Sequence, residues 1–183
     1  PPPPPGAGGG LKGSWLVEWN EGLAMIGDAM LERLSCRKVT AVFAPSLSLE
    51  GDLMGSFRMH GAGRDWESMW ENMDGALDAL IVRGVLNGAN LAEATRRGRG
   101  SIVRAGSTKF DRLAVSITIN RRQISGRSLV MDAEQFAATG QFFATRDRRV
   151  DSKLLVSTRN QGSSQILPVR VSGTLPSLVA VVR

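Results

Sequence analysis

Much of the chain alternates apolar with polar side chains, which is the pattern of β-strands that bury one face. Residues 107–120 contain a clear example of this alternation. Their apolar positions are Leu113, Val115, Ile117 and Ile119. A turn is predicted at residues 120–122, and a second alternating run follows it. The resulting hairpin carries one continuous apolar row, which either belongs to an ordinary core or lines a groove for an apolar ligand.

Further alternating runs predict strands elsewhere in the chain. They cover residues 14–20, 39–61, 76–86, 134–145, 149–159 and 166–173. The run at 39–61 is expected to form two strands, with breaks near Pro45 and Gly51. Short connections are predicted at residues 120–122, 132–134, 146–149 and 160–164. Because tight turns join antiparallel neighbours, we predict a C-terminal meander of about five strands.

Three segments carry apolar side chains at helical spacing. The first spans residues 21–34 and the third spans residues 90–97, with Asn90 as a predicted cap. The second follows Asp65, another predicted cap, and its apolar stripe is Trp66, Met69, Trp70 and Met73. Such stripes usually pack on a core. We therefore predict an α+β fold: a large twisted antiparallel β-sheet with two or three short amphipathic helices packed on one face or at one end.

The chain opens with PPPPPGAGGG, a stiff proline run followed by flexible glycines. We interpret residues 1–13 as a linker and residues 14–183 as a single domain. The sequence is interpreted as a fragment of a longer protein, whose targeting signal or anchor would lie upstream. No run of about 18 apolar residues predicts a membrane span. The single cysteine, Cys36, cannot form an internal disulfide and is expected to be a structural residue.

Charge and motifs narrow the classes of function. Residues 1–92 carry 7 basic and 11 acidic side chains, whereas residues 93–183 carry 16 basic and 6 acidic ones. With a single histidine and a single cysteine, the sequence offers no metal-binding cluster. The one nucleophile–base pair to consider is Cys36 with His60, and we expect Cys36 to be structural, so we expect no enzyme activity and no cofactor. The basic half lacks a DNA-binding motif and an aromatic stacking platform, so we expect no nucleic-acid partner.

Five stretches, taken in order, resemble the C-terminal domain of the AsmA family of Gram-negative envelope proteins. They are GRDWESMWENMDGAL, VRGVLNGANLAEATRR, GSTKFDRLAVSITINRRQI, ATGQF and PVRVSGTLPSL. The match covers roughly residues 62–178, and residues 14–61 fit the preceding part of the family more loosely. Each motif is weak alone, and their shared order carries the resemblance. Thr108 and Phe110 fall on the family's G-x-T-x-F entry strand.

The resemblance implies a non-enzymatic periplasmic domain, tethered to the inner membrane by an N-terminal segment outside this chain. Family members are β-groove proteins involved in moving phospholipid to the outer membrane or in assembling that membrane. Phospholipid or another envelope lipid, and envelope proteins, are the partners that the resemblance implies.

An apolar groove would gain about 0.8 kcal/mol for each CH₂ group that it removes from water. The candidate lipid-facing residues are Leu113, Val115, Ile117, Ile119, Leu154 and Val156, with Leu47, Leu49, Leu53 and Val150 extending the rows. Candidates for contact with head groups or with a partner are Arg121, Arg122, Arg148 and Arg149. Ala114, Ser116 and Thr118 would then lie on the outer face.

Two alternatives remain open at this point. The helices predicted at residues 23–34 and 66–73 could cover the apolar rows as an ordinary core, and both readings hold if the core closes one end while a groove opens at the other. The second alternative is a protein-interaction module of an envelope complex, which docks through a free sheet edge or through its basic surface.

Overall fold

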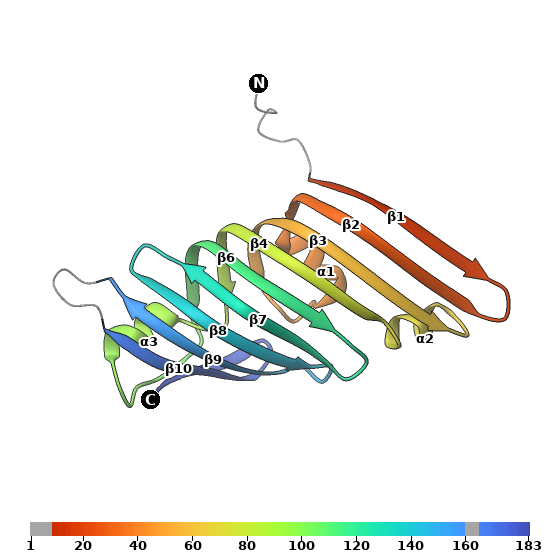
Figure 1. Cartoon of the computed structure of the whole chain (residues 1–183). Helices are drawn as coiled ribbons and strands as arrows, with labels where there is room; N and C mark the ends of the chain where they lie inside the picture. Colours follow the sequence, from red (N-terminus) through yellow and green to blue (C-terminus); the bar gives the residue numbers. More distant parts are fainter. Residues whose placement is uncertain (1–8, 160–164) are drawn as a thin grey trace, which may run out of the picture.

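The computed structural model describes residues 9–159 and 165–183. Within these residues the chain forms one antiparallel sheet of eleven strands and three short helices (Figure 1). The strands are β1 (Gly10–Trp19), β2 (Leu23–Ser35), β3 (Leu49–Gly63), β4 (Asp74–Asn87), β5 (Ile102–Arg104), β6 (Ser107–Ile119), β7 (Gln123–Asp132), β8 (Phe136–Thr145), β9 (Arg149–Thr158), β10 (Ile166–Thr174) and β11 (Ser177–Val182). The helices are α1 (Cys36–Phe43), α2 (Trp66–Glu71) and α3 (Leu91–Arg97). The predicted fold class is confirmed.

Neighbouring strands of the sheet follow one another in the chain, with one exception. The short strand β5 pairs with β11, at the opposite end of the sheet from β1. The C-terminal meander therefore runs from β6 to β11, and β11, a strand of six residues, was missed in the sequence. The predicted turn at residues 160–164 lies outside the described residues.

Residues 21–34 are not a helix, and this prediction was wrong. They form β2, which pairs along its length with β1 and β3. The apparent helical stripe is split between two faces, because Leu23 is buried whereas Ile26 and Met30 are exposed. Ladder pairing on both sides outweighs an apolar spacing that fits either period.

The prediction for residues 39–61 also needs correction. Its first part is helical in α1, and the remainder is one long strand, β3. Gly51 does not separate two strands but lies within β3, at a backbone φ of 127°, opposite a bulge formed by Arg83 and Gly84 of β4. In addition, β1 begins at Gly10, inside the stretch of residues 1–13 that was predicted to be a linker.

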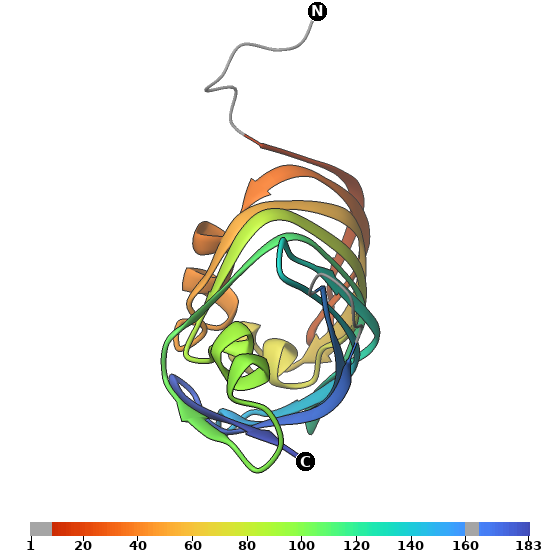
Figure 2. The ribbon, with the colours of Figure 1, turned by 90° about the vertical axis from the view of Figure 1, so that its left-hand side faces the viewer.

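The sheet curls into a trough, and each long strand runs across it from one rim to the other (Figure 2). Bulges in several strands produce this bend, because an extra residue interrupts the ladder and turns the strand. Positive φ values accompany them at Arg33 (52°), Arg83 (53°) and Ser128 (51°). Arg83 also forms an ion pair with Asp52, which joins β4 to β3 beside the bulge.

The inner face of the trough holds the hydrophobic core. One cross-strand row shows its continuity, because each member lies opposite the next on the neighbouring strand. The row is Leu34, Leu53, Ile81, Leu113, Met131, Ala138, Val156 and Leu167. All of these side chains except Leu34 are buried. A single apolar face thus crosses the sheet from β2 to β10.

Three glycines on this face lie beneath aromatic rings, and one of them is Gly27, which lies opposite Trp15 of β1. Gly84 lies opposite Phe110, and Gly126 lies opposite Phe142. A Cβ atom at any of these glycines would overlap the ring of its partner. The rings cover bare backbone at the bends, which is a recurrent way of packing a curved sheet.

We expect Gly84→Ala to destabilise the domain by about 2 kcal/mol or more, because overpacking would displace Phe110 or the bend. Gly10→Ala is the matched control, since its added methyl meets the flexible Glu32 side chain at 3.5 Å. Chemical denaturation of both variants measures the difference. Equal stability of the two variants would contradict this account of the bend.

Candidate functional site

The trough is open at its β1 end. Register pairs place Trp15 opposite Gly27, Val17 opposite Met25 and Trp19 opposite Leu23. Gly27, Met25 and Leu23 belong to the inner face, so the three β1 side chains continue the apolar lining. They remain exposed, at 42% for Trp15, 42% for Val17 and 75% for Trp19. An apolar strip thus reaches solvent at this end without a cover among the described residues.

The opposite end of the trough is closed by α3, which lies inside the curve of the sheet (Figure 2). Its Leu91 and Ala94 are fully buried and join the main core with Val103, Leu178 and Ala180. At this end, the β8–β9 turn also contacts the first half of the chain. Arg148 Nη1 donates to Ser46 Oγ at 3.3 Å, between the β8–β9 turn and the loop after α1.

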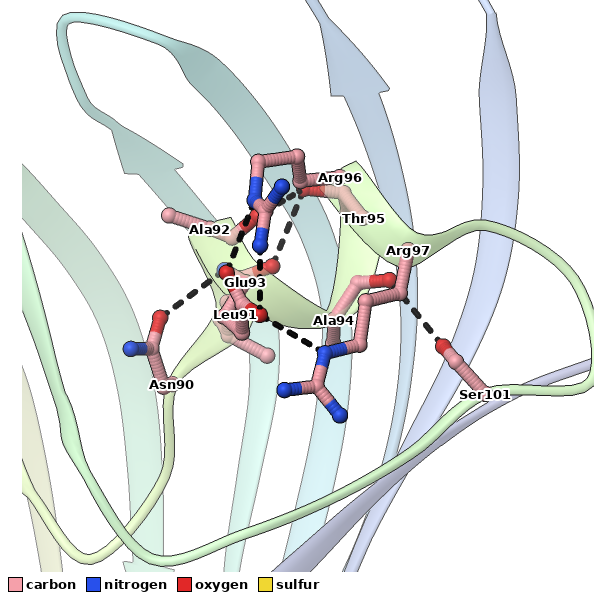
Figure 3. A network of polar contacts seen from close by, with 9 residues as sticks. All are labelled: Asn90, Leu91, Ala92, Glu93, Ala94, Thr95, Arg96, Arg97 and Ser101. Atoms are coloured by element: carbon pink, nitrogen blue, oxygen red, sulfur yellow. Dashed lines mark hydrogen bonds and ion pairs between the residues drawn. The ribbon is translucent and has the colours of Figure 1, made fainter.

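A buried threonine fixes the start of α3. Thr108 Oγ1 on β6 accepts a hydrogen bond from the Leu91 amide at 3.0 Å and donates one to the Ala89 carbonyl at 2.8 Å. Asn90 Oδ1 caps the helix by accepting from the Glu93 amide at 2.9 Å (Figure 3). The predicted cap at Asn90 is confirmed. The Thr108 hydroxyl links β6 to the first residues of α3.

Ion pairs stabilise the exposed side of α3 (Figure 3). The Glu93 carboxylate accepts from Arg96 at 2.8 Å and from Arg97 at 2.6 Å. These hydrogen bonds lower the pKa of Glu93 to about 2. The carboxylate therefore stays ionised in the folded state well below the pH at which an ordinary glutamate takes up a proton, and the pairs weaken only as the pH falls towards that value.

The helix α2 covers part of the inner face near the β1 end. Met69 and Met73 are buried against Leu23, Met25 and Met59. Asp65 caps the helix, because its carboxylate accepts from the Ser68 amide at 2.8 Å.

The two tryptophans of the predicted stripe differ in their surroundings. Trp70 packs against the small core under α2, whereas Trp66 is exposed and lies edge-on to Trp70 at a centroid distance of 5.6 Å. The stripe therefore packs through its methionines and Trp70.

The predicted lipid-facing residues share the inner face, but they differ in exposure. Leu113, Val115, Leu154 and Val156 are buried in the main core. Ile117 and Ile119 are half-buried and approach the rim that holds α2. Leu49, Leu53 and Val150 lie on the same face, whereas Leu47 lies in the loop before β3. Only the end of the row near Ile119 approaches the open part of the trough.

The candidate arginines lie in two neighbouring turns on the rim that holds α2. Arg121 and Arg122 belong to the β6–β7 turn, and Arg148 and Arg149 belong to or follow the β8–β9 turn. We call these four residues the basic rim. All four are exposed, and Arg149 forms an ion pair with Asp147 at 2.8 Å.

Arg146 joins the basic rim to α2. Its Nε donates to the Arg121 carbonyl at 2.8 Å, and its Nη2 donates to the Glu71 carbonyl at 2.7 Å. The sequence showed Arg146 as part of a basic cluster, but no local pattern indicates that it bridges two turns and a helix. The exposed inner strip of β1 was also missed, because exposure depends on which strand lies next to it.

Three further features of the described residues concern the outer face, Cys36 and metal binding. A hollow of about 760 Å³ lies on the outer face beside Leu16, Ile26, Arg58 and His60, all of which are exposed. Burial, with a smaller contribution from Asp52, raises the pKa of the Cys36 thiol to about 11, so the thiol stays protonated at neutral pH. Within residues 9–159 and 165–183, no cluster of His, Cys, Asp or Glu could hold a metal ion.

The helices of the described segments reach at most eight residues, and none is long and apolar enough to cross a membrane. Comparisons with protein families, with curated proteins and with solved structures find no significant match for the chain. The functional argument therefore depends on the geometry of the trough.

We expect Thr108→Val to destabilise the domain by about 2 kcal/mol, because it leaves the buried Leu91 amide and Ala89 carbonyl without their partner. Thr118→Val, on the exposed outer face of the same strand, is the control and should change stability little. Denaturation followed by circular dichroism measures both. A stability loss at Thr118 equal to that at Thr108 would refute the role given to this hydroxyl.

Proposed function

We propose that this domain handles lipid, holding an acyl chain against the open apolar end of its trough. The observation that carries the proposal is the exposed strip of Trp15, Val17 and Trp19, which continues the buried inner face. Monomeric soluble domains seldom leave a contiguous apolar patch exposed unless it binds something. An acyl chain on this strip would gain about 0.8 kcal/mol for each CH₂ removed from water.

The closed end limits where a lipid can lie. Leu113 and Val156 are buried among protein side chains, so the far part of the trough is core rather than binding space. Ile119 and Phe57 are half-buried next to the small core under α2. The binding region we propose therefore extends from β1 to the edge of that core.

The basic rim offers a binding surface for the phosphate of a lipid head group. Guanidinium groups form charge-assisted hydrogen bonds with phosphate oxygens, and they lie on the same rim as α2. We propose that Arg121 and Arg122 meet the phosphate of a head group while the acyl chain lies on the inner face. Arg146 supports this arrangement by tying the Arg121 carbonyl to the end of α2.

On this proposal the domain acts in the cell envelope without catalysing a reaction, as the AsmA resemblance implies. It would be the periplasmic part of a protein anchored in the inner membrane, and it would pass phospholipid towards the outer membrane or take part in assembling it. The apolar strip and the basic rim are features of this chain. The cellular location is taken from the family resemblance.

A second candidate function is docking of an envelope protein by strand addition. The free edge of β1 favours it, because ten residues in extended conformation pair on one side with β2. Strand addition depends on backbone hydrogen bonds, whereas acyl binding depends on the inner face. Substitutions on the two faces of β1 therefore separate the two functions.

We expect Val17→Asp to weaken acyl-chain binding about tenfold or more, since a carboxylate would interrupt the apolar strip. Leu16→Asp is the control, because Leu16 is 57% exposed on the opposite face of the same strand. Titration with a fluorescent fatty-acyl probe measures affinity, and native mass spectrometry after incubation with phosphatidylglycerol vesicles detects bound lipid. Equal binding by both variants, or no binding by the unmodified domain, would rule out the strip as the site.

The double variant Arg121→Glu/Arg122→Glu should weaken association with phosphatidylglycerol vesicles about 30-fold at low salt, because two basic side chains are lost and each contributes about 1 kcal/mol near an anionic surface. Association with neutral phosphatidylcholine vesicles should change little. The double variant Arg112→Glu/Arg127→Glu, at exposed positions on β6 and β7, is the charge-matched control. A loss of the same size for this control would assign the effect to net charge rather than to the basic rim.

A further inference from the structure

The free edge of β1 is the longest unpaired edge in the described part of the chain. β1 and β5 end the sheet, and β5 has three residues whereas β1 has ten. Natural edge strands are usually short, bulged or rich in charge, which prevents pairing with other chains. Within its ladder with β2, β1 is regular, and its charged side chains are Lys12 and Glu18.

Strand geometry restricts how β1 could pair with a copy of itself. In an antiparallel strand the N–H and C=O groups of one residue point to the same side, and those of the next residue point to the other. Outward-pointing residues must therefore face outward-pointing residues, so the numbers of two facing residues add to an even sum. The registers near the middle of β1 are those centred on Ser14, Trp15 or Leu16.

Only one of these registers matches opposite charges. Centring on Trp15 places Lys12 opposite Glu18 of the second copy, and the twofold symmetry repeats this pair. Centring on Ser14 places Glu18 opposite Gly10, and centring on Leu16 places it opposite Ser14. Opposite charges directly across two strands are favourable.

The inner face also matches in the register centred on Trp15. Leu11 then faces Trp19 of the second copy, Gly13 faces Val17, and Trp15 faces its own equivalent. At each end of the pairing, the large side chains of Leu11 and Trp19 therefore lie opposite each other. Val17 lies opposite Gly13, which leaves room for its side chain. Leu11 and Trp19 are 55% and 75% exposed in the single chain, so this pairing removes apolar surface from water.

We propose that two copies of this chain join through antiparallel β1–β1 pairing centred on Trp15. Because facing residues share parity, the two sheets continue each other with their inner faces on the same side. The two troughs then meet at their open ends, and α3 closes each far end. The charged pairs of this pairing lie on the outer face, whereas its inner-face contacts involve Trp15, Val17 and Trp19 of the proposed lipid-binding strip.

Sedimentation equilibrium of the purified chain tests the pairing. The unmodified chain should form dimers, and Glu18→Lys should weaken dimerisation roughly 30-fold because both charge pairs become repulsive. Lys12 is ion-paired with Glu32 of β2 at 3.0 Å. The swap Lys12→Glu/Glu18→Lys, combined with Glu32→Lys to keep that pair, should therefore restore most of the affinity. Lys38→Glu, exposed on α1, is the control and should leave the dimer intact. A monomer at every concentration, or failure of the swap to recover a folded dimer, would overturn the proposal.

Cross-linking tests the register directly. Trp15→Cys should form an intermolecular disulfide on mild oxidation, because position 15 faces itself at the Cα separation that a disulfide requires. Val17→Cys should not cross-link with itself, but it should cross-link with Gly13→Cys when the two variants are mixed. The native Cys36 is buried and should not interfere. Self-cross-linking at position 17 without cross-linking at position 15 would overturn the register.

Discussion

The fold is governed by an imbalance between apolar surface and the helices available to cover it. One face of the sheet is apolar from β2 to β11, yet the helices found in the described residues have only six to eight residues each. An antiparallel sheet can expose one face to water, but the other must be covered. Bending the strands reduces this problem, because the inner face becomes concave and the short helices α2 and α3 can cover part of it.

The details of the bend follow from this requirement. Bulges with positive φ turn the strands, and glycines opposite Phe110 and Phe142 allow the rings to lie on bare backbone. Thr108 joins the bent strand β6 to the start of α3, which fills the closed end. The curvature of the sheet, the position of α3 and the packing of the core thus depend on one another. Strand β1 lies outside this closed region.

Some of this could be predicted from the sequence, because the signals were local. The hairpin at residues 107–131 has a clear period of two, and α2 and α3 have capping residues at Asp65 and Asn90. The helix prediction for residues 23–35 was wrong because Leu23, Ile26 and Met30 fit a helical spacing by coincidence. Pairing with β1 and β3, which the sequence does not show, makes this segment a strand. The candidate site was harder to predict from the sequence. Alternation places Val115 and Val156 on one face of the sheet, but whether they are buried depends on how the sheet curves.

The direction of the strands has a consequence for how such a trough can change in size. Because the strands run across it, strand length sets the width of its cross-section, whereas the number of strands sets its length (Figure 2). Each additional strand extends it by about 4.8 Å without altering the geometry of the others. Insertion or loss of a hairpin at the β1 edge would therefore vary the reach of the trough while the plugged end kept its structure.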